Sequence, residues 1–231
     1  MFFFLFFFLS HFLPSFLHLD FFDPFGSCEW QTLWDRNLLM LRELASPQKS
    51  PLLTNFPNIN VNYSNPDFNQ QTPLHTASHN GHVKVIKVLL AHPNINVNLK
   101  NSDGQTPLSL GCENGKVLVV EVLLKDPRVD VTLEDNYGCT PLWWASYNGK
   151  REVIEWLIAC GRDLGDFKSK KGKYWERNDY TALEIAREWK RSGVVFVLER
   201  FVANPALTRQ EIRKTLNLKG LVLFSFSFHS V

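Results

Sequence analysis

The sequence predicts an all-α solenoid of stacked helix-turn-helix units with β-turn or hairpin tips, and three observations support this fold class. The tetrapeptide Thr-Pro-Leu-x begins at Thr72, Thr106 and Thr140, so it recurs every 34 residues. A glycine follows each copy nine residues later, and a pair of apolar residues follows each glycine at a fixed offset. A constant period of this length is typical of stacked supersecondary units that bury a continuous core only together.

The residues of the first unit predict two helices and a turn, in this order along the chain. Thr72 is a helix N-cap through its hydroxyl group, and Pro73 suits the first helical position, where an N–H has no partner anyway. Gly81 ends this helix, because glycine takes the left-handed conformation at little cost. Apolar residues at helical spacing over 83–90 predict a second helix. The polar stretch that follows ends in a turn at 102–104, just before the next cap.

These motifs resemble those of the ankyrin repeat family, whose pattern is D-G-x-T-P-L-H-x-A, then G-H/K-x-x-V-V and L-L. A divergent fourth copy starts at Thr181 after seven inserted residues, and Lys190 stands where its glycine should be, which predicts a different helix ending. The stretch PLLTNFPNINVN predicts a degraded copy before Asn58. The three clear matches are QQTPLHTASHNGHVKVIKVLL, DGQTPLSLGCENGKVLVVEVLL and YGCTPLWWASYNGKREVIEWLI.

The repeat pattern divides the chain into segments. We expect a Phe-rich apolar segment at 1–27, a degraded first unit at 28–65, ankyrin repeats at 66–101, 102–135 and 136–164, a Lys-rich hairpin insertion at 165–179, a divergent fourth repeat at 180–203, a C-terminal capping helix at 205–219 and an apolar tail at 220–231. In the capping helix, Thr208 and Glu211 form a capping-box pattern, and Leu207, Ile212 and Leu216 are expected on one apolar face.

The two ends of the chain differ in composition from the repeats. Residues 1–25 hold 11 of the 19 phenylalanines. One interpretation is a signal peptide or membrane anchor, although no basic residue precedes the run and Pro14 interrupts it. A second is a gene-model error, because phenylalanine, leucine, serine and proline are the residues of pyrimidine-only codons; the tail after Lys219 has the same bias. A functional Phe-rich motif is the third.

The resemblance implies that function lies on the turn tips and on the first helix of each unit, which together form a concave groove. The family's variable, partner-contacting positions flank the turn glycine and precede the helix-ending glycine. They map to Phe68, Asn69, Gln71, His79, Asn80, Ser102, Asp103, Gln105, Glu113, Asn114, Asn136, Tyr137, Cys139, Tyr147 and Asn148. Rigid aromatic side chains carry much of the energy at protein interfaces, so the tyrosines suit a protein-binding surface.

Two adjacent tryptophans and a lysine-rich insertion are individual features of this chain. Trp143 replaces the histidine of the family motif, a residue that often hydrogen-bonds between repeats, and is a candidate for a partly exposed partner contact. Trp144 is expected to pack against the adjacent unit. In the insertion, KKGK is expected to turn at Gly172, with Phe167 and Trp175 on its flanks. Lysines there could bind an anion or simply keep an exposed loop soluble; they are Lys168, Lys170, Lys171 and Lys173.

Other function classes find little support in the sequence. Histidines occupy scattered or repeat positions, so we expect no metal site, no cofactor and no catalysis. A net charge of +2 and the small number of insertion lysines argue against nucleic acid. Four widely spaced cysteines predict buried, reduced thiols and a cytoplasmic location, with membrane attachment only if residues 1–25 are an anchor. We expect a monomer that binds another protein.

Overall fold

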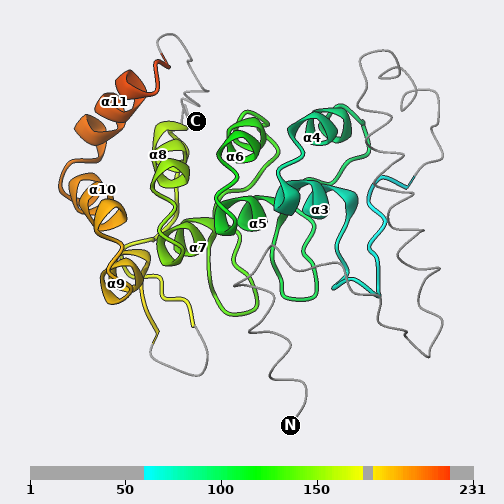
Figure 1. Ribbon diagram of the computed structural model, residues 1–231, viewed down its shortest axis with the longest axis horizontal. Helices are drawn as coiled ribbons and strands as arrows, with labels where there is room; N and C mark the ends of the chain where they lie inside the picture. Colours follow the sequence, from blue (N-terminus) through cyan, green and yellow to red (C-terminus); the bar gives the residue numbers. More distant parts are fainter. Residues whose placement is uncertain (1–59, 174–178, 219–231) are drawn as a thin grey trace, which may run out of the picture. The chain divides into compact units, whose positions relative to one another are not determined.

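The computed structural model describes residues 60–173 and 179–218. The chain divides into two compact units, Met1–Met40 and Leu41–Val231, and all described residues belong to the second. Segments 1–27 and 220–231, most of 28–65, and residues 174–178 with Trp175 lie outside the described residues. The helices in Figure 1 are α3 Pro73–Asn80, α4 Val83–Leu90, α5 Pro107–Glu113, α6 Val117–Leu124, α7 Pro141–Tyr147, α8 Arg151–Ala159, α9 Ala182–Glu188, α10 Ser192–Ala203 and α11 Pro205–Thr215.

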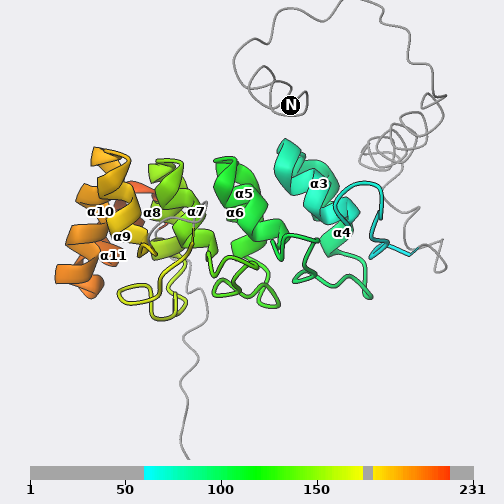
Figure 2. The same ribbon diagram turned by 90° about the horizontal axis from the view of Figure 1, so that it is seen from below.

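The helices form two layers of stacked pairs, which confirms the predicted all-α solenoid for the described part of the chain. Each inner helix packs on the next, so that α3, α5, α7 and α9 follow one another, while α4, α6 and α8 do the same in the outer layer. Figure 2 shows the pairs side by side along the stack. Loops connecting each outer helix to the next inner helix project from one side and end in the tips.

Hydroxyl caps start every inner helix, as the sequence predicts. The Thr72 hydroxyl accepts a hydrogen bond from the His75 backbone N–H, and the His75 side chain accepts one from the Thr72 N–H. Thr106 and Thr140 cap α5 and α7 through their hydroxyls alone, which accept from the backbone N–H of Ser109 and Trp143. Thr181 forms a complete capping box at the start of α9. An N-cap of this kind stabilises a helix by about 1 kcal/mol.

The helix-ending turn of the fourth repeat differs from our prediction. Lys190 adopts φ of 53°, in the same left-handed region as Gly81, Gly115 and Gly149. The following backbone N–H reaches back to Ala186 O at 2.7 Å, as Lys150 N–H does to Ala145 O at 2.8 Å. The ending is therefore the same in all four repeats, and the expectation of a different one was wrong.

Packing between repeats explains why lysine is tolerated at this position alone. A Cβ on Gly115 would lie 2.8 Å from Lys150 Cδ, and a Cβ on Gly149 would lie 2.9 Å from Arg191 Cδ. In each case the side chain belongs to the following repeat and lies across the glycine. Lys190 stands in the last repeat and is exposed. Lys190 adopts the positive φ that the turn needs, and no side chain of a following repeat lies across it among the described residues.

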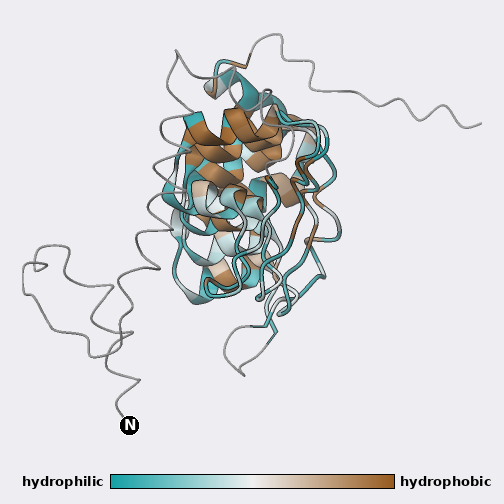
Figure 3. Ribbon diagram, turned by 90° about the vertical axis from the view of Figure 1, so that its right-hand side faces the viewer, coloured by the Kyte–Doolittle hydropathy of each residue, from teal (hydrophilic) through white to brown (hydrophobic). Residues whose placement is uncertain are grey.

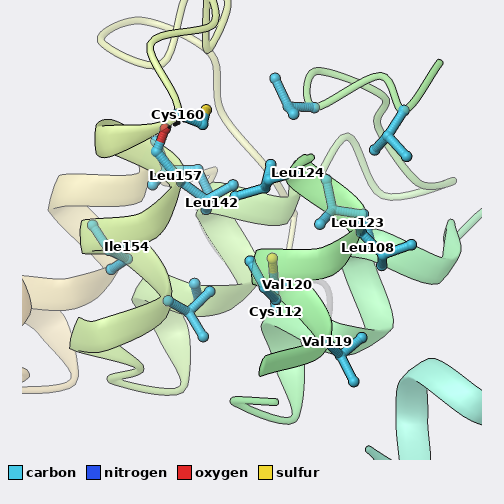
Figure 4. Packing of buried hydrophobic residues seen from close by; sticks show 14 of the residues in the cluster. Leu108, Cys112, Val119, Val120, Leu123, Leu124, Leu142, Ile154, Leu157 and Cys160 are labelled. Carbon is cyan, nitrogen blue, oxygen red and sulfur yellow. Dashed lines mark hydrogen bonds between the residues drawn. The ribbon is translucent and has the colours of Figure 1, made fainter. Parts of the chain in front are cut away.

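The core lies between the two helical layers. Its fully buried members alternate between inner and outer helices, as with Leu108 on α5 and Val120 and Leu123 on α6. Figure 3 shows that the most hydrophobic residues are concentrated in the helices of one layer, while the loops are mostly hydrophilic, and Figure 4 shows Leu142 and Leu157 in the same continuous packing. Cys112, Cys139 and Cys160 are buried and unpaired, as expected. Burial raises the pKa of the Cys112 thiol.

Arginines of one repeat cap the outer helix of the repeat before it. Arg128 donates to Leu90 O at 2.8 Å, and Arg162, 34 residues later, donates to Leu124 O at 2.8 Å. At the end of α8 the same role passes to α11, where Arg209 donates to Ile158 O and Arg213 to Ala159 O. Cationic donors at a helix C-terminus form hydrogen bonds with its unpaired carbonyl oxygens and interact favourably with the negative end of the helix dipole.

The C-terminal helix α11 begins at Pro205, where the predicted segment 205–219 begins, but the capping-box pattern at Thr208 does not mark its start. Its N-cap is Asn204, whose side chain accepts from Leu207 N–H, and Pro205 takes the first helical position. Thr208 lies inside the helix, and its buried hydroxyl donates to Arg200 O. Ile212 is buried as expected, but Leu207 is 49% exposed, so it does not belong to the apolar face. The helix packs on α8 and α10.

Candidate functional site

The tips are hairpins that hydrogen-bond to one another. In the second tip the Asn101 side chain accepts from the backbone N–H of Asp103 and Gln105, and Asp135 does the same for Tyr137 and Cys139 in the third. Gly104 and Gly138 supply the positive φ that each turn requires. The first tip is two residues longer, and Asn69 and Gln70 take the left-handed conformation there.

One backbone hydrogen bond joins each tip to the next. Ser102 N–H donates to Asn69 O, Asn136 N–H to Asp103 O, and Lys173 N–H to Tyr137 O, at 2.9–3.0 Å. Side chains reinforce the contact, because Asn69 Nδ2 donates to Asp103 Oδ2 and Asn136 Nδ2 donates to Ser102 O. The tips therefore form one connected surface beside the inner helices.

The C-terminal ends of the inner helices place equivalent side chains in two rows. Counted from the capping threonine, the first row is His79, Glu113, Tyr147 and Glu188, and the second is Asn80, Asn114, Asn148 and Trp189. The three asparagines donate through Nδ2 to carbonyl oxygens one turn earlier, at 2.9–3.2 Å. The fourth repeat departs from this pattern, because Trp189 takes the place of the asparagine.

Four aromatic side chains meet where α7 and α9 pack together. We call Trp143, Trp144, Tyr147 and Trp189 the aromatic cluster. Tyr147 stacks on Trp143 with ring centroids 5.7 Å apart, and Trp189 meets Tyr147 edge to face at 5.2 Å. Trp189 is 46% exposed, while Trp144 and Tyr147 are half-buried. The cluster thus presents partly exposed aromatic surface where α7 and α9 pack together.

Burial of Trp143 corrects our expectation that it is an exposed contact. It is 2% exposed, and its Nε1 donates to Tyr180 O at 2.8 Å. In the first repeat His75 Nε2 makes the equivalent link to Gln105 O at 3.0 Å. Trp143 therefore replaces that histidine as an inter-repeat donor. Trp144, expected in the packing between units, is half-buried and donates from Nε1 to Asp135 Oδ2 at 2.8 Å.

Three carboxylates lie near one another, and we call Asp103, Glu113 and Asp135 the acidic group. Asp135, which contacts Trp144 of the aromatic cluster, is buried, whereas Asp103 and Glu113 are of intermediate exposure. Burial raises the pKa of both Glu113 and Asp135, and the charge of Asp103 raises both further. Their hydrogen-bond donors are neutral: Gln105 Nε2 for Glu113, Asn69 Nδ2 for Asp103, and Trp144 Nε1 for Asp135. Among residues 60–173 and 179–218, no ion pair includes any of the three.

Comparison with known protein families gives a direct match. A family model described as Ankyrin repeats (3 copies) matches residues 44–135 and 95–168, more than half of the chain. The chain belongs to the ankyrin repeat family. No curated protein matches it. Ankyrin repeats are generally protein–protein interaction modules, so the tips and inner helices are the surface on which function is expected.

The expected ankyrin contact residues fall into three groups. Exposed residues are Phe68, His79, Asn80, Ser102, Asn136 and Tyr137, and residues of intermediate exposure are Asn69, Gln71, Asp103, Glu113, Asn114, Tyr147 and Asn148. Trp143, Gln105 and Cys139 are buried, which corrects their assignment to the partner surface. Gln105 instead positions Glu113, and Cys139 packs beneath Gly172.

The insertion folds back onto the ankyrin stack rather than turning at Gly172. Gly172 forms an antiparallel bridge with Tyr180. It packs against Trp143 and Cys139, and a Cβ at position 172 would lie only 2.6 Å from Cys139 Sγ. The expected turn at Gly172 was therefore wrong, because Gly172 lies in the bridge. Phe167 stacks on Phe201 with centroids 5.4 Å apart.

The four insertion lysines differ in their surroundings. Lys170 Nζ pairs with Glu134 Oε1 at 2.8 Å, and the charge of Lys171 helps to lower the pKa of Glu184 after the larger effect of Thr181. Lys168 and Lys173 are exposed. Two of the four charges therefore already have acidic neighbours within the protein.

Sequence reasoning missed Trp189, although a signal was present. The residue lies eight positions after Thr181, as Asn148 lies eight after Thr140, so the repeat register alone places it beside the asparagine row.

Within the described ranges, no group of His, Cys, Asp and Glu side chains has the arrangement of a metal site. None of the described helices is long and apolar enough to cross a membrane.

Proposed function

We propose that this protein is a non-catalytic adaptor that binds a partner protein in the groove formed by the tips and inner helices of repeats two to four. The observation that carries the proposal is the aromatic cluster. Nearly half of the Trp189 side chain is exposed, at a position where the other three repeats have a helix-capping asparagine. Exposed tryptophan and tyrosine beside satisfied polar groups are the usual composition of an interface hot spot.

Two features make this surface suited to tight binding. The hydrogen bonds between tips and the packing among the four rings hold the surface in one conformation before a partner arrives, which reduces the entropy lost on binding. Tyr137 on the third tip is exposed, and Trp189 at the C-cap of α9 meets Tyr147 edge to face, so repeats three and four both contribute exposed aromatic groups. A partner segment lying between them would contact repeats three and four at once.

The alternative of an anion binder that uses the insertion has weaker support. Lys170 is paired with Glu134, and Lys171 lies near Glu184, so the insertion offers less uncompensated positive charge than its sequence suggests. Buried, reduced cysteines favour a reducing compartment such as the cytoplasm as the site of this adaptor. We expect it to act as a monomer.

The test is affinity capture from the native cell with the full chain, after nuclease treatment. The double variant Tyr147→Ala, Trp189→Ala is compared with a control, Leu118→Ala, Phe196→Ala, which removes exposed apolar side chains from the outer helices α6 and α10. We expect a discrete protein that the groove variant loses and the control retains. Equal capture by both variants, or capture only of nuclease-sensitive material, would contradict the proposal.

A further inference from the structure

We propose that the partner segment bound in the groove is basic, and that an arginine side chain of this segment stacks on the exposed face of Trp189 while its guanidinium faces Glu113 and Glu188. This inference rests on the proposed function and names the chemistry of the partner. It is carried by charge complementarity, by the aromatic faces and by the positions of the carboxylates at the helix ends.

Carboxylates flank Tyr147 on both sides along the groove. Glu113, Tyr147 and Glu188 are the last residues of α5, α7 and α9, and these helices pack directly on one another. Equivalent residues of neighbouring packed helices lie about 8–10 Å apart. An aromatic ring with a carboxylate one helix away on either side is an environment for a cation.

The position of these carboxylates is unfavourable for the helices themselves. A negative charge at a helix C-terminus opposes the dipole, which favours cations there. In the first repeat the same place holds His79 rather than an acid. Glu113 is also partly buried and close to two further acids, and burial and repulsion both raise its pKa. These costs fall together at the part of the groove that is richest in aromatic side chains.

Neighbouring cations make their own contacts elsewhere. Arg187 pairs with Glu199 at 2.7 Å, and Arg191 Nε donates to Tyr147 O at the helix end. Lys116 lies near His79, whose pKa it lowers after the larger effect of burial. None of these three forms an ion pair with the acidic group within the described ranges.

Arginine fits this surface better than lysine. Its planar guanidinium stacks on an aromatic face while its N–H groups reach carboxylates at the edge, and it loses hydration more readily than an ammonium group. Trp189 is 46% exposed and meets Tyr147 nearly edge to face, at an interplanar angle of 79°, so the contact with Tyr147 holds an exposed indole ring on which a guanidinium could stack. An acidic peptide would meet repulsion from the same carboxylates.

The test uses the full chain and a fluorescein-labelled nonapeptide of alternating glycine and arginine, followed by fluorescence anisotropy at low salt. Glycine–lysine and glycine–glutamate peptides of the same length are the comparison probes. We expect saturable binding of the arginine peptide, weaker binding of the lysine peptide, and none of the glutamate peptide. Glu113→Gln and Trp189→Ala should each raise Kd about tenfold, because each removes an electrostatic or cation–π contact.

A matched control removes one negative charge outside the groove. Glu152 lies exposed in the first turn of α8, and Glu152→Gln should change Kd less than about twofold. Circular dichroism establishes that each variant is folded. Equal weakening by Glu113→Gln and Glu152→Gln, equal binding of the glutamate peptide, or no saturation up to about 1 mM would overturn the inference.

The outcome can be separated from that of the proposed function. If the captured partner is lost with Tyr147→Ala, Trp189→Ala but the arginine peptide does not bind, the groove is a protein-binding site for a segment of other chemistry. If the captured partner does not depend on these aromatic residues, the proposed function itself is wrong.

Discussion

Replacing Lys190 by glycine should stabilise the protein, against the general tendency of glycine to destabilise. Lys190 holds φ of 53° in the helix-ending turn, a conformation that is unfavourable for a side chain with a Cβ. Its side chain is exposed and forms no ion pair within the described ranges. Relief of about 1–2 kcal/mol of strain, less the greater entropy of glycine in the unfolded chain, leaves a gain of about 0.5–1 kcal/mol.

The measurements are urea unfolding, which gives the free energy of unfolding, and thermal unfolding, which gives Tm; both are followed by circular dichroism and by tryptophan fluorescence. A chain of 231 residues should gain about 2–4 °C in Tm for each kcal/mol. Lys190→Ala is the control, because it removes the same side chain and keeps the strained conformation, so it should not stabilise. Gly149→Ala should destabilise by more than about 1 kcal/mol, since it adds strain and a contact with Arg191 Cδ. The reasoning fails if Lys190→Ala stabilises as much as Lys190→Gly.

Three further predictions concern contacts between repeats. Burial lowers the pKa of His75 from 6.5 to about 4, so the unfolded state binds the proton first as pH falls. The wild-type protein should therefore lose about 2 kcal/mol of unfolding free energy between pH 7.5 and pH 5. The variant His75→Gln should not show this loss when urea unfolding is measured at each pH. Gly172→Ala should cost about 1–3 kcal/mol through its clash with Cys139 Sγ. Combining it with Cys139→Ala should cost less than the two single changes together, in a double-mutant cycle. Arg162→Ala should destabilise by about 1–2 kcal/mol in thermal unfolding, because it leaves Leu124 O, Asp126 O and Val129 O without their charged donor, whereas the exposed Arg151→Ala should change little.

Most of the fold could be predicted because its determinants are local. The threonine cap, the following proline and the helix-ending glycine each act within one turn of helix, and their recurrence every 34 residues fixes the stacking. The N-cap of α11 was also within reach of the sequence, because Asn204 followed by Pro205 is a cap of the same kind as the threonine–proline pairs. The capping-box pattern at Thr208 and Glu211 lies one turn further on, inside the helix.

The site was harder to predict because it depends on contacts between distant segments. Trp143 is buried because the insertion returns to pair Gly172 with Tyr180 above it, and nothing within the third repeat indicates that return. Gln105 is buried because its amide turns inward to Glu113. By contrast, the exposure of Tyr137 could be predicted from the repeat register alone, because it lies at the tip of a turn.

Two departures from the repeat pattern, at Trp189 and Lys190, lie next to each other in the last repeat, and the same physical cause permits both. In the earlier repeats the helix-ending glycine is covered by a basic side chain from the next repeat, and the asparagine before it caps the helix. The terminal repeat has no following ankyrin unit within the described residues, and α11 packs on α8 and α10 of the outer layer. The end of α9 is thereby free to carry a bulky aromatic residue, which the Tyr147 ring orients toward the groove. The strained lysine is a cost tolerated at that end, which is why Lys190→Gly should raise stability while leaving binding at Trp189 unchanged.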